Sequence, residues 1–280
     1  MSDIQPFKWS EILQHWHLGG LPNLLLALAL ALYVVGVRRV SHWPLSRSLN
    51  FVGGLVITFL ATQSVVGYYD MSLFGDHMVE HLLLIMVAAP LFAFAAPLEL
   101  ARQASPRLDA LLSSPVARML LHPLFGFGLY VAVIPLTHLT SFFNLMLTNE
   151  WVHHTEQIGF LVVGYLFFRQ AVGLERDCVL HPGLGVLFVM AAVPVDTITG
   201  LALAMSSHNP FPAYDAMMRV WQGVTWGPSV LADIHLGGAI MWIGGDGLML
   251  LWVGPLVARW VRYETRRTKE IDAELDELGL

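Results

Sequence analysis

The stretch DHMVEHLLLIMVAAP, residues 76–90, decides the fold because it joins polar and apolar residues in one segment. Its second half is apolar enough to lie inside a membrane, yet its first half carries His77, Glu80 and His81. Positions i, i+3 and i+4 share one face of a helix. We therefore expect a membrane helix whose first turns bring two imidazoles and a carboxylate to one spot.

The composition is that of an integral membrane protein. The chain has 280 residues, of which 56% are hydrophobic and 13% charged, whereas a soluble domain carries about 25% charged residues. The net charge is −6 and the sequence has no basic stripe, so we expect a lipid bilayer and not nucleic acid as its surroundings. The single cysteine, Cys178, excludes an internal disulfide and a metal site built from several thiolates.

The apolar residues are grouped into runs of the length that crosses a bilayer, which is roughly 20 residues for a helix. Seven such runs are present, at about 21–37, 50–68, 77–99, 117–138, 152–169, 182–205 and 232–258. This predicts an all-α fold, a seven-transmembrane helical bundle. No long polar linker interrupts it, so we expect a single domain over 1–258 with a short outer N-terminal segment, followed by a charged cytoplasmic tail at 259–280.

The basic residues are distributed unequally between the two ends of the predicted helices. All of the 15 Lys and Arg residues except Lys8 and Arg219 fall at one end or in the tail. Cytoplasmic segments carry an excess of Lys and Arg. The sequence therefore predicts that the N-terminus lies outside and the C-terminus in the cytoplasm.

Most of the 12 histidines fall at the predicted outer end, and these are His15, His17, His77, His81, His138, His153, His154, His208 and His235. The runs that begin near residues 77, 152 and 232 all lead inward from that end, so the histidines that open them lie at similar depth. Ionisable groups within a span usually face a cavity or a partner. A histidine at a helix end can also be an interfacial residue with one hydrogen bond, and both interpretations stay open.

The spacing of these residues indicates a metal site. His77 and His81 have the i, i+4 spacing that is common in metal sites, and His153 repeats a similar pattern with Glu156 on a second helix. We expect His77, His81 and His153 to form the core of the site.

Further ligand candidates are His154, Asp233 and His235. Asp233 and His235 are two residues apart and do not share a helical face, which leaves open that one of them lies on the turn before the helix. We expect Asp233 or His235 to complete the site.

Imidazole and carboxylate ligands without a thiolate suit copper or zinc, and methionine would favour copper. The methionines in the outer halves of the predicted helices or in outer loops are Met71, Met78, Met86, Met146, Met205 and Met241. A single methionine inside a membrane helix usually serves only for packing, so these residues alone do not establish a copper site.

Two acidic residues are expected inside the membrane, Asp196 after Pro194 and Asp246 in the last run. Such a residue is costly unless it is neutral, paired or hydrated. A proton relay, a partner that orients an imidazole and a simple hydrogen bond between helices are the alternatives. Pro90 and Pro97 predict kinks in the run 77–99.

Three segments resemble the CtaG-like family of cytochrome c oxidase assembly factors, of the Bacillus type. They are HMVEHLLLIMVAAPLFAFAAPLEL at 77–100, EWVHHTEQIGFLVVGYLFF at 150–168 and ADIHLGGAIMWIGGDG at 232–247. The resemblance implies a multi-pass protein of the bacterial plasma membrane that helps to mature a copper-dependent oxidase. Oxidase subunits or copper chaperones would be its partners, and it would bind copper transiently.

The resemblance also extends to single residues. His77, His81 and His153 match histidines of the family, and Asp233 matches the acid that opens its last helix. The family pattern implies a second histidine where this chain has Gln157, and a glutamine where it has Ile234. Ligation would then shift to His154 or His235.

Two alternatives of a different class remain. An intramembrane zinc hydrolase would use the histidine pair and a carboxylate base, although Glu80 does not stand where the HExxH motif places its glutamate. A haem-binding protein would use two histidines from different helices as axial ligands. The sequence has no catalytic nucleophile motif, which disfavours an enzyme.

Overall fold

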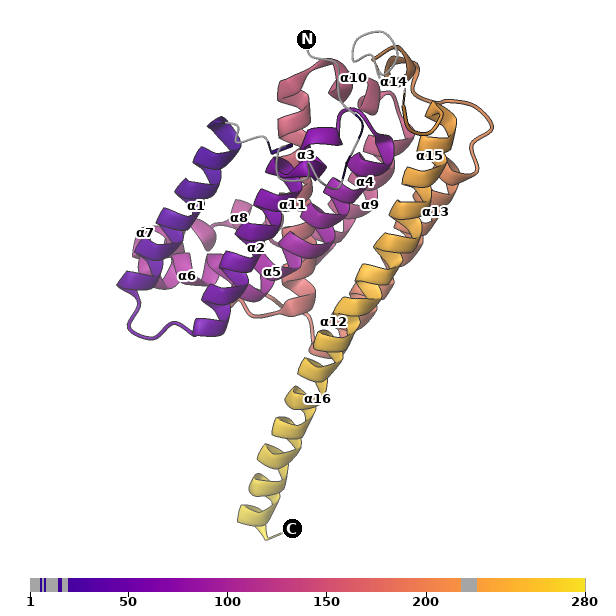
Figure 1. Ribbon diagram of the computed structural model, residues 1–280. Coiled ribbons are helices and arrows are strands. Elements are labelled where there is room, and N and C mark those ends of the chain that lie inside the picture. The colour runs from indigo at the N-terminus through magenta and orange to yellow at the C-terminus, as the bar shows by residue number, and fades with distance from the viewer. Residues whose placement is uncertain (1–5, 7, 9–14, 17–19, 218–225, 280) are drawn as a thin grey trace.

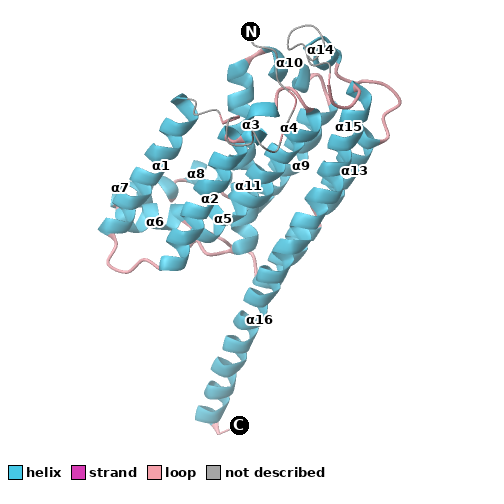
Figure 2. Ribbon diagram, in the orientation of Figure 1, coloured by secondary structure: helices cyan, strands magenta, loops and turns pink. Residues whose placement is uncertain are grey.

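The computed structural model describes residues 6, 8, 15–16, 20–217 and 226–279 (Figure 1). Throughout these residues the regular elements are helices and none is a strand (Figure 2). The prediction of an all-α fold is therefore confirmed. Two residues named above, His17 and Arg219, lie outside the described residues.

Each of the runs predicted from the sequence lies on one helix or on a series of helices that follow one another. In chain order the elements are α1 (Gly20–Arg39), α2 (Leu45–Gln63), α3 (Val65–Tyr69), α4 (Phe74–Leu82), η2 (Leu83–Ala88), α5 (Ala89–Ala95), α6 (Pro97–Ala104), α7 (Pro106–Leu112), α8 (Pro115–Leu120), α9 (Pro123–Leu139), α10 (Phe142–Thr148), α11 (Glu150–Val172), α12 (Pro182–Met190), α13 (Val193–Ala204), α14 (Pro212–Ala216), α15 (Val230–Ala239), η4 (Ile240–Gly244) and α16 (Gly245–Leu278). The elements η2 and η4 are π-helical.

The predicted number of seven spans is not confirmed. Among the described residues, 5 helices are long and apolar enough to cross a membrane, or up to 6 if α9 and α10, bent by 70°, form one span. The remaining predicted run corresponds to α11, which carries Glu150, Glu156 and Arg169 besides two histidines. These polar residues are the physical reason that α11 departs from the composition of a simple apolar span. Several apolar helices nevertheless make this a multi-pass membrane protein.

Two prolines and a left-handed alanine mark where the helix that carries the site is interrupted. Helix α4 gives way to the π-helix η2, and α5, which contains Pro90, follows directly. Helix α5 ends at Ala96, which has a left-handed φ of 51°. Pro97 then begins α6, in the first-turn position that tolerates a missing amide hydrogen. At the two positions where kinks were expected, the structure has a π-helix before Pro90 and a break before Pro97. Both lie between the polar residues at the start of α4 and the end of the run at α6.

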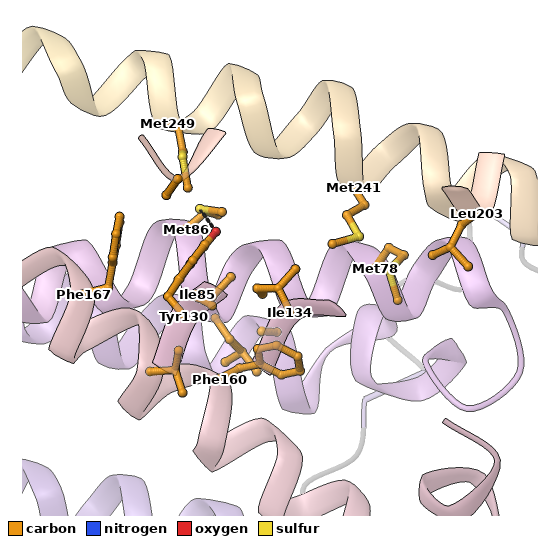
Figure 3. Packing of buried hydrophobic residues seen from close by; sticks show 14 of the residues in the cluster. Met78, Ile85, Met86, Tyr130, Ile134, Phe160, Phe167, Leu203, Met241 and Met249 are labelled. Carbon is orange, nitrogen blue, oxygen red and sulfur yellow. Dashed lines mark hydrogen bonds between the residues drawn. The ribbon is translucent and has the colours of Figure 1, made fainter. Parts of the chain in front are cut away.

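The segment α4–η2–α5 is the centre of the bundle, because α4 packs on α15 while η2 and α5 pack on α2 and α11. Small residues permit close approach elsewhere. A Cβ atom on Gly238 of α15 would lie 2.6 Å from the carbonyl oxygen of Gly200 in α13, and small residues at such contacts are typical of membrane helix pairs. The buried core follows the central segment, as Figure 3 shows for Met78, Ile85 and Met86.

The two ends of α11 differ in character. His153 lies near its start, and Arg169 near its end is 1% exposed. Arg169 donates to Glu175 and Asp177 at 2.6 and 2.8 Å, and Arg102 lies 3.4 Å from Asp177. Basic residues thus gather at the end of the bundle away from the histidines, in keeping with the predicted sidedness, which stays a prediction.

The last helix continues without a break from the bundle into the charged tail. Figure 1 shows α16 extending beyond the other helices, and its residues from Arg262 to Leu278 are exposed. The prediction of a separate tail at 259–280 stays untested, since the boundary at residue 258 falls inside one continuous helix.

Candidate metal site

The first turns of α4 place three polar side chains on one buried face. His77, Glu80 and His81 are 0%, 0% and 4% exposed, respectively. The rings of His77 and His81 have their centroids 4.0 Å apart, as expected for residues one helical turn apart. The convergence that the spacing predicts is present.

Helix α11 contributes the facing residues. Asn149 caps the helix by accepting hydrogen bonds from the amides of Trp151 and Val152, so the residues that follow occupy regular helical positions. Glu156 Oε2 lies 3.8 Å from Nε2 of both His77 and His81. The carboxylate therefore stands between the two imidazoles of the neighbouring helix.

A second set of contacts involves His153, also on α11. Its Nε2 atom lies 3.6 Å from Glu80 Oε2 and 3.1 Å from Oδ2 of Asp70, which follows α3. Gln157, one turn further along α11, donates from Nε2 to Glu80 Oε1 at 2.6 Å. The family resemblance implied a histidine at this position, and here the side chain instead orients a carboxylate.

His138, from the end of α9, fixes the orientation of His81. The Nδ1 atom of His138 lies 2.8 Å both from the carbonyl oxygen of Ile134 and from Oγ1 of Thr137. The Thr137 hydroxyl donates to the carbonyl oxygen of Val133 at 2.9 Å, and a carbonyl only accepts, so we assign the His138 proton to Nδ1. His138 Nε2 therefore accepts, and His81 Nδ1 donates to it at 3.2 Å. The remaining atom, His81 Nε2, keeps its lone pair and faces Glu156.

Several buried atoms of the cluster lack a hydrogen bond. Within the described part of the chain no polar atom lies at hydrogen-bond distance from Nδ1 and Nε2 of His77, Nε2 of His81, Oε2 of Glu80 or Oε2 of Glu156. Buried polar atoms are almost always paired because an unpaired one costs about 1–3 kcal/mol. These atoms are the ones that a metal ion would bind.

The cluster meets the distance requirement for metal binding in two overlapping groups. His77, Glu80 and His153 form one group, and His77, His81 and Glu156 form the other. In each, the possible ligand atoms lie within 4.8 Å of one another. Ligands at about 2 Å from a tetrahedral ion lie about 3.3 Å apart, so these residues fit a metal ion once their side chains close on it.

A cavity of about 760 Å³ leads to one side of the cluster. Asp70, His153 and Gln157 are part of its wall, as are Met71 and Glu150. The cavity lies at the same end of the bundle as the histidines and provides access to them.

Other residues predicted for the site lie elsewhere. His154 is partly exposed in the cavity wall, where its ring contacts Gln157 at 3.2 Å. His235 hydrogen bonds from Nε2 to the carbonyl oxygen of Ser206 at 2.8 Å. The structure does not bring either into the cluster of His77, His81 and His153.

Asp233 is engaged in stabilising the start of α4. Its carboxylate accepts hydrogen bonds from the amides of Phe74 and Gly75 at 2.7 and 3.0 Å, and from the hydroxyl of Tyr214. From α15 it thus satisfies the first two amides of α4, whose own N-cap residue, Leu73, makes no side-chain hydrogen bond to them. Asp233 and His235 both lie on α15, and neither is on a preceding turn.

The methionines considered above are mainly part of the core. Figure 3 shows Met78, Met86 and Met241 among the buried side chains between the central segment and the last series of helices, α15, η4 and α16. Met146 is also buried, whereas Met205 is 78% exposed and Met71 lies in the cavity wall. The donors of the cluster are therefore nitrogen and oxygen.

The two acids inside the bundle form hydrogen bonds between helices. Tyr130 of α9 donates to Asp196 of α13 at 2.7 Å, and Thr197 of α13 donates to Asp246 of α16 at 2.8 Å. Of the alternatives considered for these acids, these contacts favour the hydrogen bond between helices.

Comparison with known proteins supports the resemblance. Residues 31–263 match the family described as cytochrome c oxidase caa3 assembly factor. The chain belongs to this family. It is also 30% identical to uncharacterised proteins of Mycobacterium bovis and Mycobacterium tuberculosis, over 97% of this chain and 43% of each relative.

A third relative, from Mycobacterium leprae, is 30% identical over 87% of this chain and 39% of its own length. The chain therefore spans less than half the length of these relatives. No solved structure matches it.

Proposed function

We propose that this chain acts in the assembly of a copper-dependent cytochrome c oxidase by binding copper transiently at the cluster of His77, His81, Glu156, Glu80 and His153. The family supports the role in assembly, and the unpaired nitrogen and oxygen atoms of the cluster support the metal. The protein would lie in the bacterial plasma membrane with the cluster near the outer face.

The observation that carries the proposal is the protonation pattern fixed by His138. Because His138 holds the proton of His81 on Nδ1, the Nε2 lone pair is turned toward Glu156. A metal-bound histidine typically makes a hydrogen bond of this kind with its other nitrogen, which fixes the ring and its tautomer. His81 would thus bind an ion without a change of tautomer.

The role of copper as cargo agrees with the position of the cavity. Asp70 and His153 face the cavity, so an ion can reach the buried ligands without crossing the apolar core. We propose that oxidase subunits or copper chaperones exchange copper with the chain at this end of the bundle.

The alternatives are distinguished by the same residues. Nitrogen and oxygen donors also suit zinc, so the metal must be identified by analysis. Haem is disfavoured between His81 and His138, because their facing nitrogens lie 3.2 Å apart in a direct hydrogen bond and leave no space for an iron ion bonded to both.

The test is a strain whose sole copy of the protein carries His77→Ala and His81→Ala. We expect normal abundance in the membrane, with copper content and oxidase activity both reduced. External copper in excess should restore part of the activity by mass action. The control is His208→Ala, which removes an exposed histidine. Wild-type oxidase activity in the double variant at normal abundance would exclude the copper proposal.

A further inference from the structure

His77 belongs to both groups of potential ligands, and both of its ring nitrogens are available. It is 0% exposed, and neither Nδ1 nor Nε2 has a hydrogen-bond partner within the described residues. His81 already uses Nδ1 in its contact with His138, and His153 uses Nε2 in its contact with Asp70. Each of these two histidines also belongs to only one of the groups. A buried imidazole with two free nitrogens between two sets of ligands is the arrangement of a bridging ligand.

The two groups differ in the residues that complete them. On one side of His77 are Glu80 and His153, with Asp70 3.1 Å from His153 Nε2. On the other side are His81 and Glu156. Apart from His77, the two groups have no ligand in common.

The groups also differ in access. Of the residues described by the structure, His153 and Asp70 line the cavity of about 760 Å³, whereas Glu80, His77, His81 and Glu156 do not. The group of Glu80 and His153 therefore reaches the cavity through His153. Glu156 is 6% exposed, and the ring of Phe160 has its centroid 4.2 Å from that of His81. One group is therefore next to the access route, and the other lies behind it against apolar side chains.

We propose that the cluster contains two metal positions that share His77, an outer position at Glu80 and His153 and an inner position at His81 and Glu156. This inference rests on the proposed metal binding and deepens it. Nε2 of His77 serves the inner position, since it lies 3.8 Å from Glu156 Oε2, and Nδ1 is left for the outer one. A neutral imidazole has one lone pair, so His77 binds the first ion as imidazole and bridges both ions only as imidazolate. Binding of the second ion displaces the N–H proton of His77, which leaves to water through the cavity, and the oxidation state of the ions is unchanged.

The arrangement provides a stepwise route for cargo. An ion arrives through the cavity at His153 and Glu80 and is passed by way of His77 to the buried set. The carboxylate of each position would offset part of the positive charge of the ion, which a protein interior otherwise solvates poorly. Return of the ion to a partner would follow the same ligands in reverse.

The test is the metal stoichiometry of the full chain purified in detergent and titrated with Cu²⁺, with Zn²⁺ in a parallel experiment. We expect two ions per wild-type chain and one in each of the variants Glu80→Gln and Glu156→Gln. These substitutions keep side-chain shape, and thermal melting of each variant checks that it is folded. The matched control is Glu274→Gln on the exposed part of α16, which should keep two ions.

Electron paramagnetic resonance gives an independent measurement. Two Cu²⁺ ions bridged by the ring of His77 couple magnetically, so at low temperature we expect a spin count well below two per wild-type chain. The Glu156→Gln variant, with a single ion, should give the full signal of one uncoupled Cu²⁺ per chain. One ion per wild-type chain, lost on substitution of either glutamate, would overturn the two positions and leave the proposed function intact. No bound ion in a folded wild-type chain would overturn both.

Discussion

His81 Nδ1 donates a hydrogen bond to His138 Nε2 across 3.2 Å, from α4 to the end of α9. This contact joins a predicted metal ligand to a residue on the side of the His81 ring opposite Glu156. Its direction follows from the bond between His138 Nδ1 and the carbonyl of Ile134. The function of His138 is therefore to position His81 and to select its tautomer.

The first prediction concerns this positioning role. His138→Ala removes the acceptor of the His81 proton, and we expect copper affinity to fall by about 10–100-fold, the usual effect of losing an orienting partner. His138→Gln supplies an amide oxygen as acceptor and should recover part of the affinity. Competition with a copper chelator measures both. Equal loss in the two variants would contradict a positioning role through a hydrogen bond.

The sequence allowed the central part of the cluster to be predicted because helical spacing is a local property. His77, Glu80 and His81 share a face whatever surrounds them, and His153 with Glu156 repeats this on α11. The approach of α4 to α11 was an expectation from similar depth. It is the packing of η2 and α5 on α11 that brings the two faces together.

Other members of the cluster could not be predicted in the same way. Asp70 follows a short helix, and His138 ends a helix elsewhere in the chain, so only tertiary packing gives them their neighbours. His138 was recognised as an outer histidine but not as the partner of His81. The sequence also gave no indication of the π-helix η2, whose position directly after α4 depends on the packing of the central run.

The second prediction concerns Asp233, for which the sequence indicated a ligand and the structure an acceptor for the first amides of α4. The amides at the start of a helix need acceptors and attract negative charge, which explains the position of this carboxylate. We expect Asp233→Ala to destabilise the protein by about 1–2 kcal/mol, as loss of a cap does, with copper stoichiometry unchanged in the folded fraction. Thermal melting and metal analysis measure the two effects. Loss of one equivalent of copper without a change in melting would identify Asp233 as a ligand.

The third prediction concerns the ion pairs at the opposite end of α11. Glu175 is 4% exposed and accepts from Arg169 and from the hydroxyl of Tyr165, each at 2.6 Å. Glu175→Gln leaves the buried guanidinium with less compensation, and breaking a buried pair typically costs about 3–5 kcal/mol. We expect a clearly lower melting temperature, and no such change for Asp272→Asn on the exposed part of α16.

Cys178 reports on the same region because its thiol donates to the carbonyl of Arg169 at 3.3 Å. Burial raises the pKa of the Cys178 thiol from 9.0 to about 11. Since the thiolate is the reactive form, a shift of two units lowers its fraction near pH 8 by about 100-fold. Alkylation should be slow in the wild type, speed up as pH rises toward 11 and be faster in Glu175→Gln. Equal rates at pH 8 for both proteins would show that Glu175 does not hold this loop.

The last prediction concerns sidedness. The basic residues at the end of α11 and along α16 place that end of the bundle in the cytoplasm if the excess of Lys and Arg determines orientation. Since α16 continues as one helix to Leu278, a fluorescent protein fused to the C-terminus should mature in the cytoplasm, whereas alkaline phosphatase fused there should be inactive. As a control, alkaline phosphatase inserted at residues 206–211, at the opposite end of the bundle, should be active. The reverse pattern would place the histidine cluster at the cytoplasmic face, and copper would then have to reach it from inside the cell.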